Sequence, residues 1–247
     1  MADDREQRVL AEDELYQQYE QSVITELERE LAAPARRRSI ARVCVVSFVV
    51  FMVLGNVAIA AASLVAQRLD RTVHLELPGV HNGFVVDDKV WRGAAPGEEA
   101  YRSLAAAGAA TIVDLRAEDD LEIDRELLRE LGLRRVHIPI RDGQRPSDAQ
   151  VRHFIEVVNE TRDGTVFVHC GAGVGRTGSI VAAYRLLGGT ASRFEVLRDN
   201  LTAGPPSLEQ LSYAANSSIT GTHDPNPILV GASRVLDAPR RIWSYIK

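Results

Sequence analysis

Cysteine is scarce in this chain, which holds only Cys44 and Cys170 among its 247 residues. Cys44 lies in a long apolar run and Cys170 in a glycine-rich segment, so we expect no disulfide between them. The chain is therefore not a disulfide-stapled scaffold. The sequence also lacks the patterns C-x-x-C and H-E-x-x-H, and we predict neither a metal site nor a metal cofactor.

An excess of positive charge is absent as well. The chain has 29 Lys and Arg against 34 Asp and Glu, a formal net charge of −5. This balance does not indicate a nucleic-acid partner. The apolar content of 45% is ordinary for a globular protein, and the length suffices for one domain with extensions.

Residues 1–39 form an acidic segment in which apolar residues recur every four positions. That spacing predicts a helix with one apolar stripe. The stripe fits either a solvated helix with a weak packing face or a helix that binds a partner, as in a coiled coil. The residues of the stripe are Leu15, Tyr19, Val23, Leu27 and Leu31.

Residues 43–67 contain no charged side chain. As a helix they span roughly 37 Å, enough for a hydrocarbon core of about 30 Å. We therefore expect a transmembrane helix over residues 40–68, with residues 43–66 in contact with the lipid bilayer. A buried core helix is one alternative. A cleaved signal peptide ending near "AIAAAS" is another, although the apolar stretch is long for one and starts far from Met1.

Positive charge around this segment predicts its orientation. The more basic flank tends to remain cytoplasmic. We expect a single-pass membrane protein with its N-terminus in the cytoplasm and the larger C-terminal part outside. The preceding arginines are Arg36, Arg37, Arg38 and Arg42, and the following ones are Arg68 and Arg71.

The rest of the chain has the pattern of a soluble α/β domain. We expect a linker over residues 69–84, the domain over 85–220 and an irregular tail over 221–247. Strand-like segments such as "ATIVDLR", "RRVHIPI" and "TVFVH" alternate with helical ones. This alternation predicts a mostly parallel sheet flanked by helices, and such sheets bind ligands at the carboxyl ends of their strands. Cys170 directly follows "TVFVH" and should lie at that edge.

The segment "VFVHCGAGVGRTGS" allows two interpretations. Gly173, Gly175 and Gly178 fit G-x-G-x-x-G, the dinucleotide fingerprint. That fingerprint needs a second strand ending in an acid about 20 residues later. Glu195 lies at that distance, but "TASRFEVLRDNL" has the pattern of a capped helix. The dinucleotide interpretation is therefore disfavoured.

The alternative is a loop that binds and attacks phosphate. A cysteine at a helix N-terminus is stabilised as a thiolate, the form that acts as a nucleophile. Glycines let the following N–H groups curl around an anion. Arg176 supplies a planar fork for two phosphate oxygens. Thr177 can donate its hydroxyl to the sulfur, and His169 can fix the cysteine from behind.

"HCGAGVGRTG" resembles the signature H-C-x-x-G-x-x-R-[S/T] of protein tyrosine and dual-specificity phosphatases. "VWRGAAP", "TIVDLRAEDD" and "VHIPIRDG" are similar to segments of their compact atypical and bacterial members. The resemblance implies a cysteinyl-phosphate intermediate, catalytic roles for Cys170, Arg176 and Thr177, a supporting role for His169, and no metal. It implies a phosphate cradle made of Gly171, Ala172, Gly173, Val174, Gly175 and Arg176.

The resemblance also implies an aspartic acid that protonates the leaving group. Asp142 follows "RRVHIPI" and is the favoured candidate, although Asp-Gly also forms turns. Asp148 is the alternative, and the pair Asp119 and Asp120 ranks third. Asp114 is expected to be structural. Two arginines, Arg92 and Arg116, are candidates for supporting the phosphate pocket or for structural salt bridges.

The expected activity is that of a membrane-anchored phosphatase acting on phosphotyrosine, with phosphoserine and phosphothreonine as further substrates. The alternative is a phosphoinositide or inositol phosphate phosphatase with the same mechanism. The segment 171–175 has no lysine, which favours the first. A phosphate-binding module without turnover is a third possibility, opposed by the intact Cys170, Arg176 and Asp142.

Overall fold

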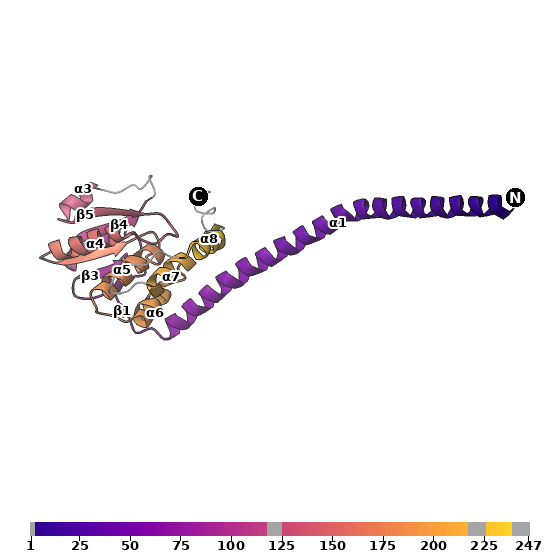
Figure 1. Ribbon diagram of the computed structural model, residues 1–247. Coiled ribbons are helices and arrows are strands. Elements are labelled where there is room, and N and C mark those ends of the chain that lie inside the picture. The colour runs from indigo at the N-terminus through magenta and orange to yellow at the C-terminus, as the bar shows by residue number, and fades with distance from the viewer. Residues whose placement is uncertain (1–2, 118–124, 217–225, 239–247) are drawn as a thin grey trace. The chain divides into compact units, whose positions relative to one another are not determined.

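The computed structural model describes the chain except for residues 1–2, 118–124, 217–225 and 239–247. It divides into two compact units, Met1–Leu54 and Gly55–Lys247. The first helix, α1 (Asp3–Arg68), runs from one unit into the other without a break (Figure 1). The expected helix over residues 1–39 and the apolar helix over 40–68 are therefore parts of one continuous element.

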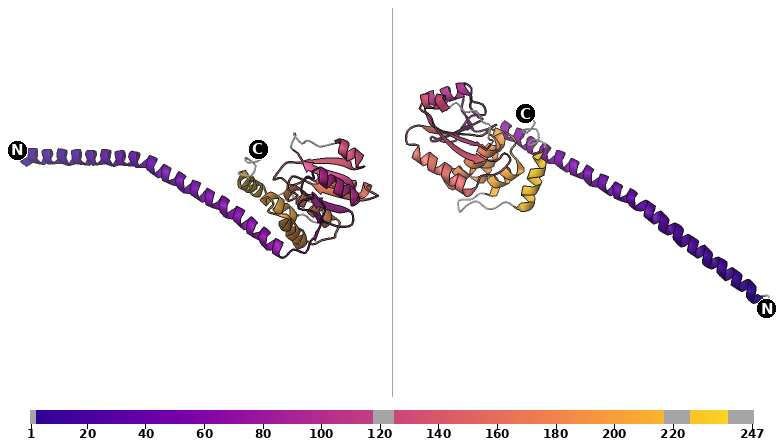
Figure 2. Two further views of the ribbon diagram at one scale, coloured as in Figure 1. Left: turned by 180° about the vertical axis from the view of Figure 1, so that it is seen from behind. Right: turned by 90° about the horizontal axis from the view of Figure 1, so that it is seen from above.

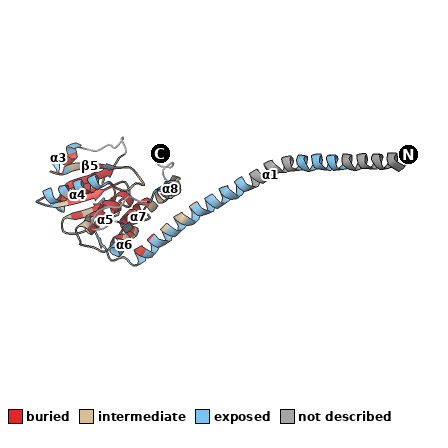
Figure 3. Ribbon diagram, in the orientation of Figure 1, coloured by how far each residue is buried: buried red, intermediate tan, exposed pale blue. Residues whose placement is uncertain are grey.

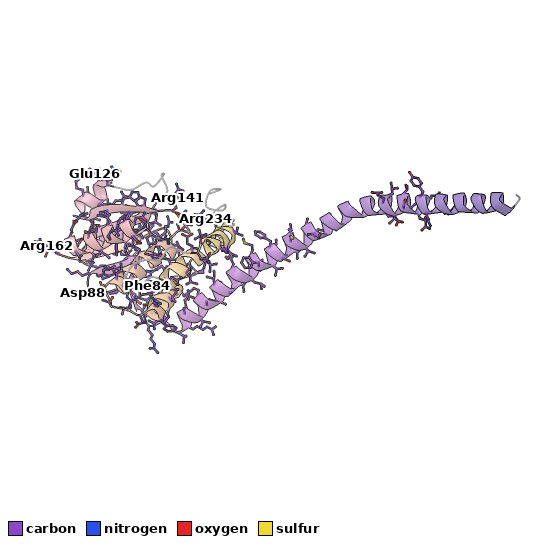
Figure 4. All side chains as sticks on the ribbon, viewed as in Figure 1. Phe84, Asp88, Glu126, Arg141, Arg162 and Arg234 are labelled. Carbon is purple, nitrogen blue, oxygen red and sulfur yellow. The ribbon has the colours of Figure 1, made fainter. Side chains whose placement is uncertain are left out.

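The apolar part of α1, Ile40–Arg68, is long and apolar enough to cross a membrane, with a mean hydropathy of 2.6 in its most apolar window. None of the residues in that window is buried, which argues against a core helix of a soluble domain. This part of the helix is mostly exposed (Figure 3), and its large apolar side chains project outward (Figure 4). The helix thus exposes a surface that water alone does not favour.

The second unit is built on a six-stranded sheet of order β1-β2-β3-β6-β4-β5. The four strands β3, β6, β4 and β5 are parallel, as predicted, whereas β1 and β2 pair antiparallel at one edge. The sheet is therefore mixed. Its strands are β1 (Val73–His74), β2 (Phe84–Val85), β3 (Val90–Gly93), β4 (Ala109–Arg116), β5 (Arg134–Ile140) and β6 (Thr165–His169).

Helices cover both faces of the sheet (Figure 2). One face packs against α2 (Glu98–Ala106) and α3 (Arg125–Glu130), the other against α4 (Asp148–Glu160) and α5 (Gly175–Leu187). On β6 the alternation of side chains sends Phe167 to the first face and Val166 and Val168 to the second. Two further helices, α6 (Arg193–Ala203) and α7 (Leu208–Asn216), pack against α5.

Local sequence signals explain how several helices begin. Ser147 caps α4 as predicted and forms a reciprocal capping box with Gln150. Ser192 caps α6 in the same way, with Glu195 as its partner. Glu195 therefore stabilises a helix, which agrees with the rejection of a dinucleotide fold.

Two expectations about irregular segments are wrong. The segment 69–84, expected to be a linker, contributes β1 and the first residue of β2 to the sheet. The segment 221–247, expected to be irregular, contains α8 (Pro227–Leu236). Its prolines suggested broken structure, but Pro227 occupies the first turn of α8, where the missing N–H has no helical partner to lose.

The end of α1 belongs to the second unit. Ser63 and Ala66 are buried there, and the Ser63 hydroxyl donates to the Leu201 carbonyl of α6 at 2.6 Å. The Gln67 side chain donates to the Thr202 carbonyl at 3.4 Å. The last two turns of the apolar helix are therefore tied directly to the α/β unit.

Candidate active site

The glycine loop joins the end of β6 to the start of α5, at the carboxyl edge of the parallel strands. Cys170 continues the alternation of β6, so it lies on the same face as Val168 and is only 3% exposed. Gly175 opens α5. The loop thus places a buried cysteine below the N-terminus of a helix, where anions are stabilised.

Each carbonyl of residues 171–174 accepts a hydrogen bond from the surrounding scaffold. Because a trans peptide directs its C=O and its N–H to opposite sides, the N–H groups of residues 172–175 face the interior of the loop. Converging N–H groups of this kind form an anion-binding nest. The bonds run from Ala95 N to Gly171 O (2.9 Å), Asn82 Nδ2 to Ala172 O (3.0 Å), Arg92 Nη2 to Gly173 O (2.8 Å) and Gly178 N to Val174 O (2.9 Å).

Asn82 is a supporting residue that the sequence analysis missed. Its side-chain amide donates both to the Ala172 carbonyl and to the Ala203 carbonyl, at 3.0 and 2.9 Å. Among the described residues it is the one non-glycine with a positive φ, at 50°. Asparagine tolerates that conformation better than most residues. The "HNG" turn was the available signal, but a turn does not reveal what its side chain will hold.

Arg92 supports the loop from behind. It is 3% exposed, and its guanidinium donates to Gly173 O, to Val174 O at 3.4 Å and to Asn200 Oδ1 at 3.3 Å. Burial lowers the pKa of Arg92 to about 10, partly offset by the charges of Cys170 and Asp199. Its contacts hold the loop backbone, so Arg92 is placed to position the phosphate cradle.

Two glycines of the loop are required by close packing. Gly173 has a φ of +73°, and a Cβ there would overlap the backbone of Gly93 and come within 2.6 Å of Ala94 N. A Cβ on Gly175 would overlap the side-chain amide of Gln210. Close contacts with β3 and α7 therefore explain the G-x-G spacing, and no dinucleotide-binding site is needed to explain it.

Arg176 and Asp142 meet at the mouth of the loop. Arg176 lies in the first turn of α5 and is buried, while Asp142 follows β5 and its side chain is 33% exposed. Arg176 Nη2 lies 3.4 Å from Asp142 Oδ1, and Arg176 Nη1 donates to Ile140 O at 3.3 Å. The structure therefore brings together the predicted phosphate-binding arginine and the favoured acid.

The other acid candidates are placed differently. Asp148 occupies the first turn of α4, where a carboxylate complements the helix dipole. Asp119 and Asp120 lie outside the described residues.

The segment that follows Asp142 is held by hydrogen bonds from α7 and from Ser207, the residue directly before α7. The sequence did not reveal this connection. These contacts fix the backbone of residues 143–145 and so restrict where Asp142 can lie. They run from Ser207 Oγ to Gly143 O (2.8 Å), from Gln210 Nε2 to Gln144 O (3.1 Å) and from Arg145 N to Glu209 Oε1 (3.3 Å). Gln210 also packs against Gly175, so one side chain contacts both catalytic segments.

His169 lies behind Cys170 and is fully buried. Its Nδ1 lies 3.1 Å from the Cys170 carbonyl and 3.9 Å from Asp114 Oδ1. Burial lowers the pKa of His169 to about 4, against the pull of Asp114 in the other direction. The imidazole is thus neutral at physiological pH, and its hydrogen bond places it where it can support the loop.

Of the two candidate arginines, Arg116 is the one that lies in a salt bridge. It forms a two-pronged ion pair with Asp114, with both N···O distances at 2.9 Å, and Arg135 adds a third contact at 3.1 Å. The pairing with Arg116 and the nearby His169 hold the pKa of Asp114 well below its usual range, despite its burial. Asp114 thus lies in a cluster of ion pairs, whereas Arg92 is the arginine that contacts the loop backbone.

Thr177 is fully buried in the first turn of α5. Its hydroxyl has no hydrogen-bond partner among the residues that the structure describes. It thus retains a donor beside the base of the loop. Within the same described residues no group of three or more His, Cys, Asp or Glu side chains could hold a metal ion.

Comparisons with known proteins agree with this geometry. Residues 82–216, which include the whole loop, match the family described as DSP-PTPase phosphatase fused to NAD+ kinase. Over 148 residues the chain is 28% identical to probable NAD kinase 2, chloroplastic, of Oryza sativa subsp. japonica. Over 62 residues it is 37% identical to the tyrosine-protein phosphatase CDC14 homologue of Schizosaccharomyces pombe.

These matches cover 56% and 25% of this chain but only 15% and 12% of the two relatives. The fold is similar to that of P. aeruginosa TpbA, with a TM-score of 0.52 and 22% identity over 62% of this chain and 94% of that one. The family match spans more than half of the chain and contains the cysteine loop, its arginine and its supporting residues. The chain therefore belongs to the cysteine-based dual-specificity phosphatases, in the family described with a fused NAD+ kinase, and is a phosphoric monoester hydrolase.

Proposed function

We propose that this protein is a membrane-anchored phosphatase that hydrolyses phosphotyrosine in proteins, with phosphoserine and phosphothreonine as further substrates, through a cysteinyl-phosphate. The observation that carries the proposal is the set of hydrogen bonds that turns every carbonyl of residues 171–174 away from the loop interior. These bonds preorganise the donors before a phosphate arrives, which is the form of electrostatic stabilisation most effective in catalysis.

In the first step the inward N–H groups and the Arg176 guanidinium hold the phosphate oxygens. The Cys170 thiolate attacks phosphorus, and the bond from phosphorus to the ester oxygen breaks. Asp142, at 3.4 Å from Arg176, donates its proton to that oxygen. The products of this step are the protein alcohol or phenol and a cysteinyl-phosphate.

In the second step water attacks the cysteinyl-phosphate, and the sulfur–phosphorus bond breaks. Asp142, now a carboxylate, takes the proton from the water. The buried Thr177 hydroxyl donates to the departing thiolate. The cycle consumes one ester and one water and releases one alcohol and one phosphate, without a metal.

The substrate class rests on the loop and on the relatives. Residues 171–175 carry no cationic side chain, so the loop itself offers a phosphate site and no further charge for a polyphosphorylated ring. The relatives from Schizosaccharomyces pombe and Homo sapiens are named as tyrosine-protein and dual-specificity phosphatases. Both observations favour phosphorylated proteins over phosphoinositides.

The membrane anchor rests on the apolar, exposed helix over residues 40–68. Because Ser63 and Ala66 pack into the phosphatase unit, no flexible linker separates it from the end of that helix. The enzyme should therefore act close to the bilayer surface.

The arginines at 36, 37, 38 and 42 favour a cytoplasmic N-terminus and an extracytoplasmic catalytic domain. A C-terminal reporter that is active only outside the cytoplasm should be active; an inactive, fully translated fusion would reverse the orientation.

The full chain in detergent micelles tests the activity. Phosphotyrosine peptide, phosphoserine peptide and phosphatidylinositol phosphates are assayed with a chelator present, alongside Cys170→Ser. We expect the phosphotyrosine peptide to be turned over fastest and Cys170→Ser to lose about 10⁴-fold or more. A preference for the phosphoinositides would replace the substrate assignment. Activity that survives Cys170→Ser or disappears with the chelator would overturn the mechanism.

A further inference from the structure

A second cavity lies in the phosphatase unit, apart from the glycine loop. Its volume is about 190 Å³, and β2, α5 and α6 line it together with the residues that follow α1. Phe84, labelled in Figure 4, forms part of its wall. None of residues 170–177 lines it. Organic ligands usually occupy pockets of roughly 300–1,000 Å³, so this one suits a smaller group.

The cavity is strongly cationic. Four arginines line it, against one carboxylate, that of Asp199, which gives a formal balance of +3. Asp199 accepts from two of these arginines, at 2.6 and 2.8 Å. The four are Arg71, Arg92, Arg185 and Arg198.

Two of these arginines keep hydrogen-bonding capacity. Arg71 is exposed and forms no ion pair with any residue that the structure describes. Arg92 is 3% exposed and uses both of its Nη groups, but its Nε is buried and has no partner within the described residues. An anion in the cavity would bind the exposed Arg71 guanidinium and offset the positive charge of the buried Arg92.

We infer that this cavity is a second anion site that binds a phosphate group, carried by a free phosphate or by the headgroup of an anionic lipid. Guanidinium groups match phosphate oxygens in a planar, two-pronged geometry. Arg71 lies three residues beyond the end of α1, so a lipid headgroup at the membrane surface is one source of that phosphate. Soluble phosphate or a phosphomonoester is the other.

The site is coupled to the catalytic loop through Arg92. The same guanidinium that lines the cavity donates to the carbonyls of Gly173 and Val174. A phosphate in the cavity leaves both of those bonds in place and adds an opposite charge that holds the side chain. Occupancy should therefore stabilise the protein and raise kcat by holding the loop in its anion-binding form.

Thermal unfolding of the full chain in detergent micelles tests the site without relying on activity. The probes are inorganic phosphate in one arm and phosphatidylglycerol, against phosphatidylcholine, in the other. At a hundredfold excess over Kd, a bound probe should raise Tm by about 5 °C or more. Arg71→Gln and Arg198→Gln should each weaken binding of the probe and raise its Kd about tenfold.

Arg68→Gln is the matched control, because Arg68 lies in the last turn of α1 and does not line the cavity. It removes one positive charge near the same place and should keep the full shift. An Arg71-dependent shift with inorganic phosphate supports a free anion, and one with phosphatidylglycerol alone supports a lipid headgroup. Equal shifts in Arg71→Gln and Arg68→Gln, or no shift with either probe, would overturn the site.

Activity provides a second readout. The probe that stabilises the wild type should raise kcat for an aryl phosphate in the wild type and in Arg68→Gln, and about ten times more probe should be needed for the same rise in Arg71→Gln. Phosphate also competes at the catalytic loop and raises KM there, so kcat at saturating substrate is the quantity to compare. A Tm shift without this rise in kcat would contradict the coupling through Arg92.

Discussion

The glycine loop and the apolar part of α1 are opposite kinds of surface. In the loop, Cys170 and Val174 are 3% and 8% exposed, and each backbone carbonyl has a partner within the domain. In α1, Val43 and Leu54 are 63% and 62% exposed and the backbone is satisfied by the helix alone. The loop is specified by contacts inside the protein, whereas the helix exposes apolar side chains that such contacts do not cover. Substitutions in the two regions should therefore fail in different ways.

Among variants that keep the Cys170 nucleophile, the largest effect is expected at Asp142, whose side chain is 33% exposed. Asp142→Asn should lower kcat about 10³-fold for an alkyl phosphate, whose leaving oxygen needs a proton, and much less for p-nitrophenyl phosphate. Steady-state kinetics with both substrates measure the difference. Asp148→Asn is the matched control and should change kcat little, because Asp148 only complements the α4 dipole. Equal losses with both substrates would remove Asp142 as the acid.

Gly173→Ala tests whether the loop needs its close contact with β3. The added Cβ would overlap Gly93, so the loop must shift, and a misplaced cradle should lower kcat/KM about 10²-fold. Gly189→Ala is the control, because Gly189 has a similar φ of +65° but nothing within 4 Å of the added Cβ. It should cost only about 1 kcal/mol of stability and leave kinetics intact. If both variants keep wild-type kinetics, the loop is not held as the hydrogen bonds indicate.

The buried histidine behind the loop predicts an acid-sensitive stability. The pKa of His169 is about 4 in the folded protein and 6.5 ordinarily, so between these values the unfolded chain binds the extra proton. The free energy of unfolding should have its full value above pH 6.5 and fall by about 3 kcal/mol as the pH drops to 4. The lowered pKa of the Asp114 carboxyl adds a further loss only below its ordinary value of 3.8.

Urea unfolding at several pH values measures this slope. His169→Asn should flatten the profile between pH 6.5 and 4, whereas His153→Asn, which changes a half-exposed histidine on α4, should keep the wild-type slope. The same slope in both variants would mean that His169 is not the group that titrates.

The sequence predicted what short-range patterns encode. The four parallel strands, the Ser147 cap and the residues Cys170, Arg176 and Asp142 follow from periodicity, capping and fixed spacing. These signals were strong because the chemistry requires particular residue types at particular separations.

Residues that act across long separations were missed. Asn82 is 90 positions from the Ala172 carbonyl that it holds, and Gln210 is 66 from the Gln144 carbonyl. Neither stands in a pattern of its own, because its role exists only once the chain has folded. The docking of α1 was missed for the same reason, since Ser63 looked like one of a few polar interruptions in an apolar run.

Ser63 therefore provides the smallest and most specific test of the boundary between the two kinds of surface. Its hydroxyl donates to Leu201 O at 2.6 Å, and Ser63→Ala should lower the unfolding free energy of the full chain in micelles by about 1 kcal/mol. Leu64→Ala, at the next and 62% exposed position, should change it by less than about 0.5 kcal/mol, because most of that side chain lies outside the protein interior. Chemical denaturation followed by Trp fluorescence compares the two. If Leu64→Ala destabilises the phosphatase unit as much as Ser63→Ala, then the helix end is stabilised by its apolar surroundings and not by the hydrogen bond at Ser63.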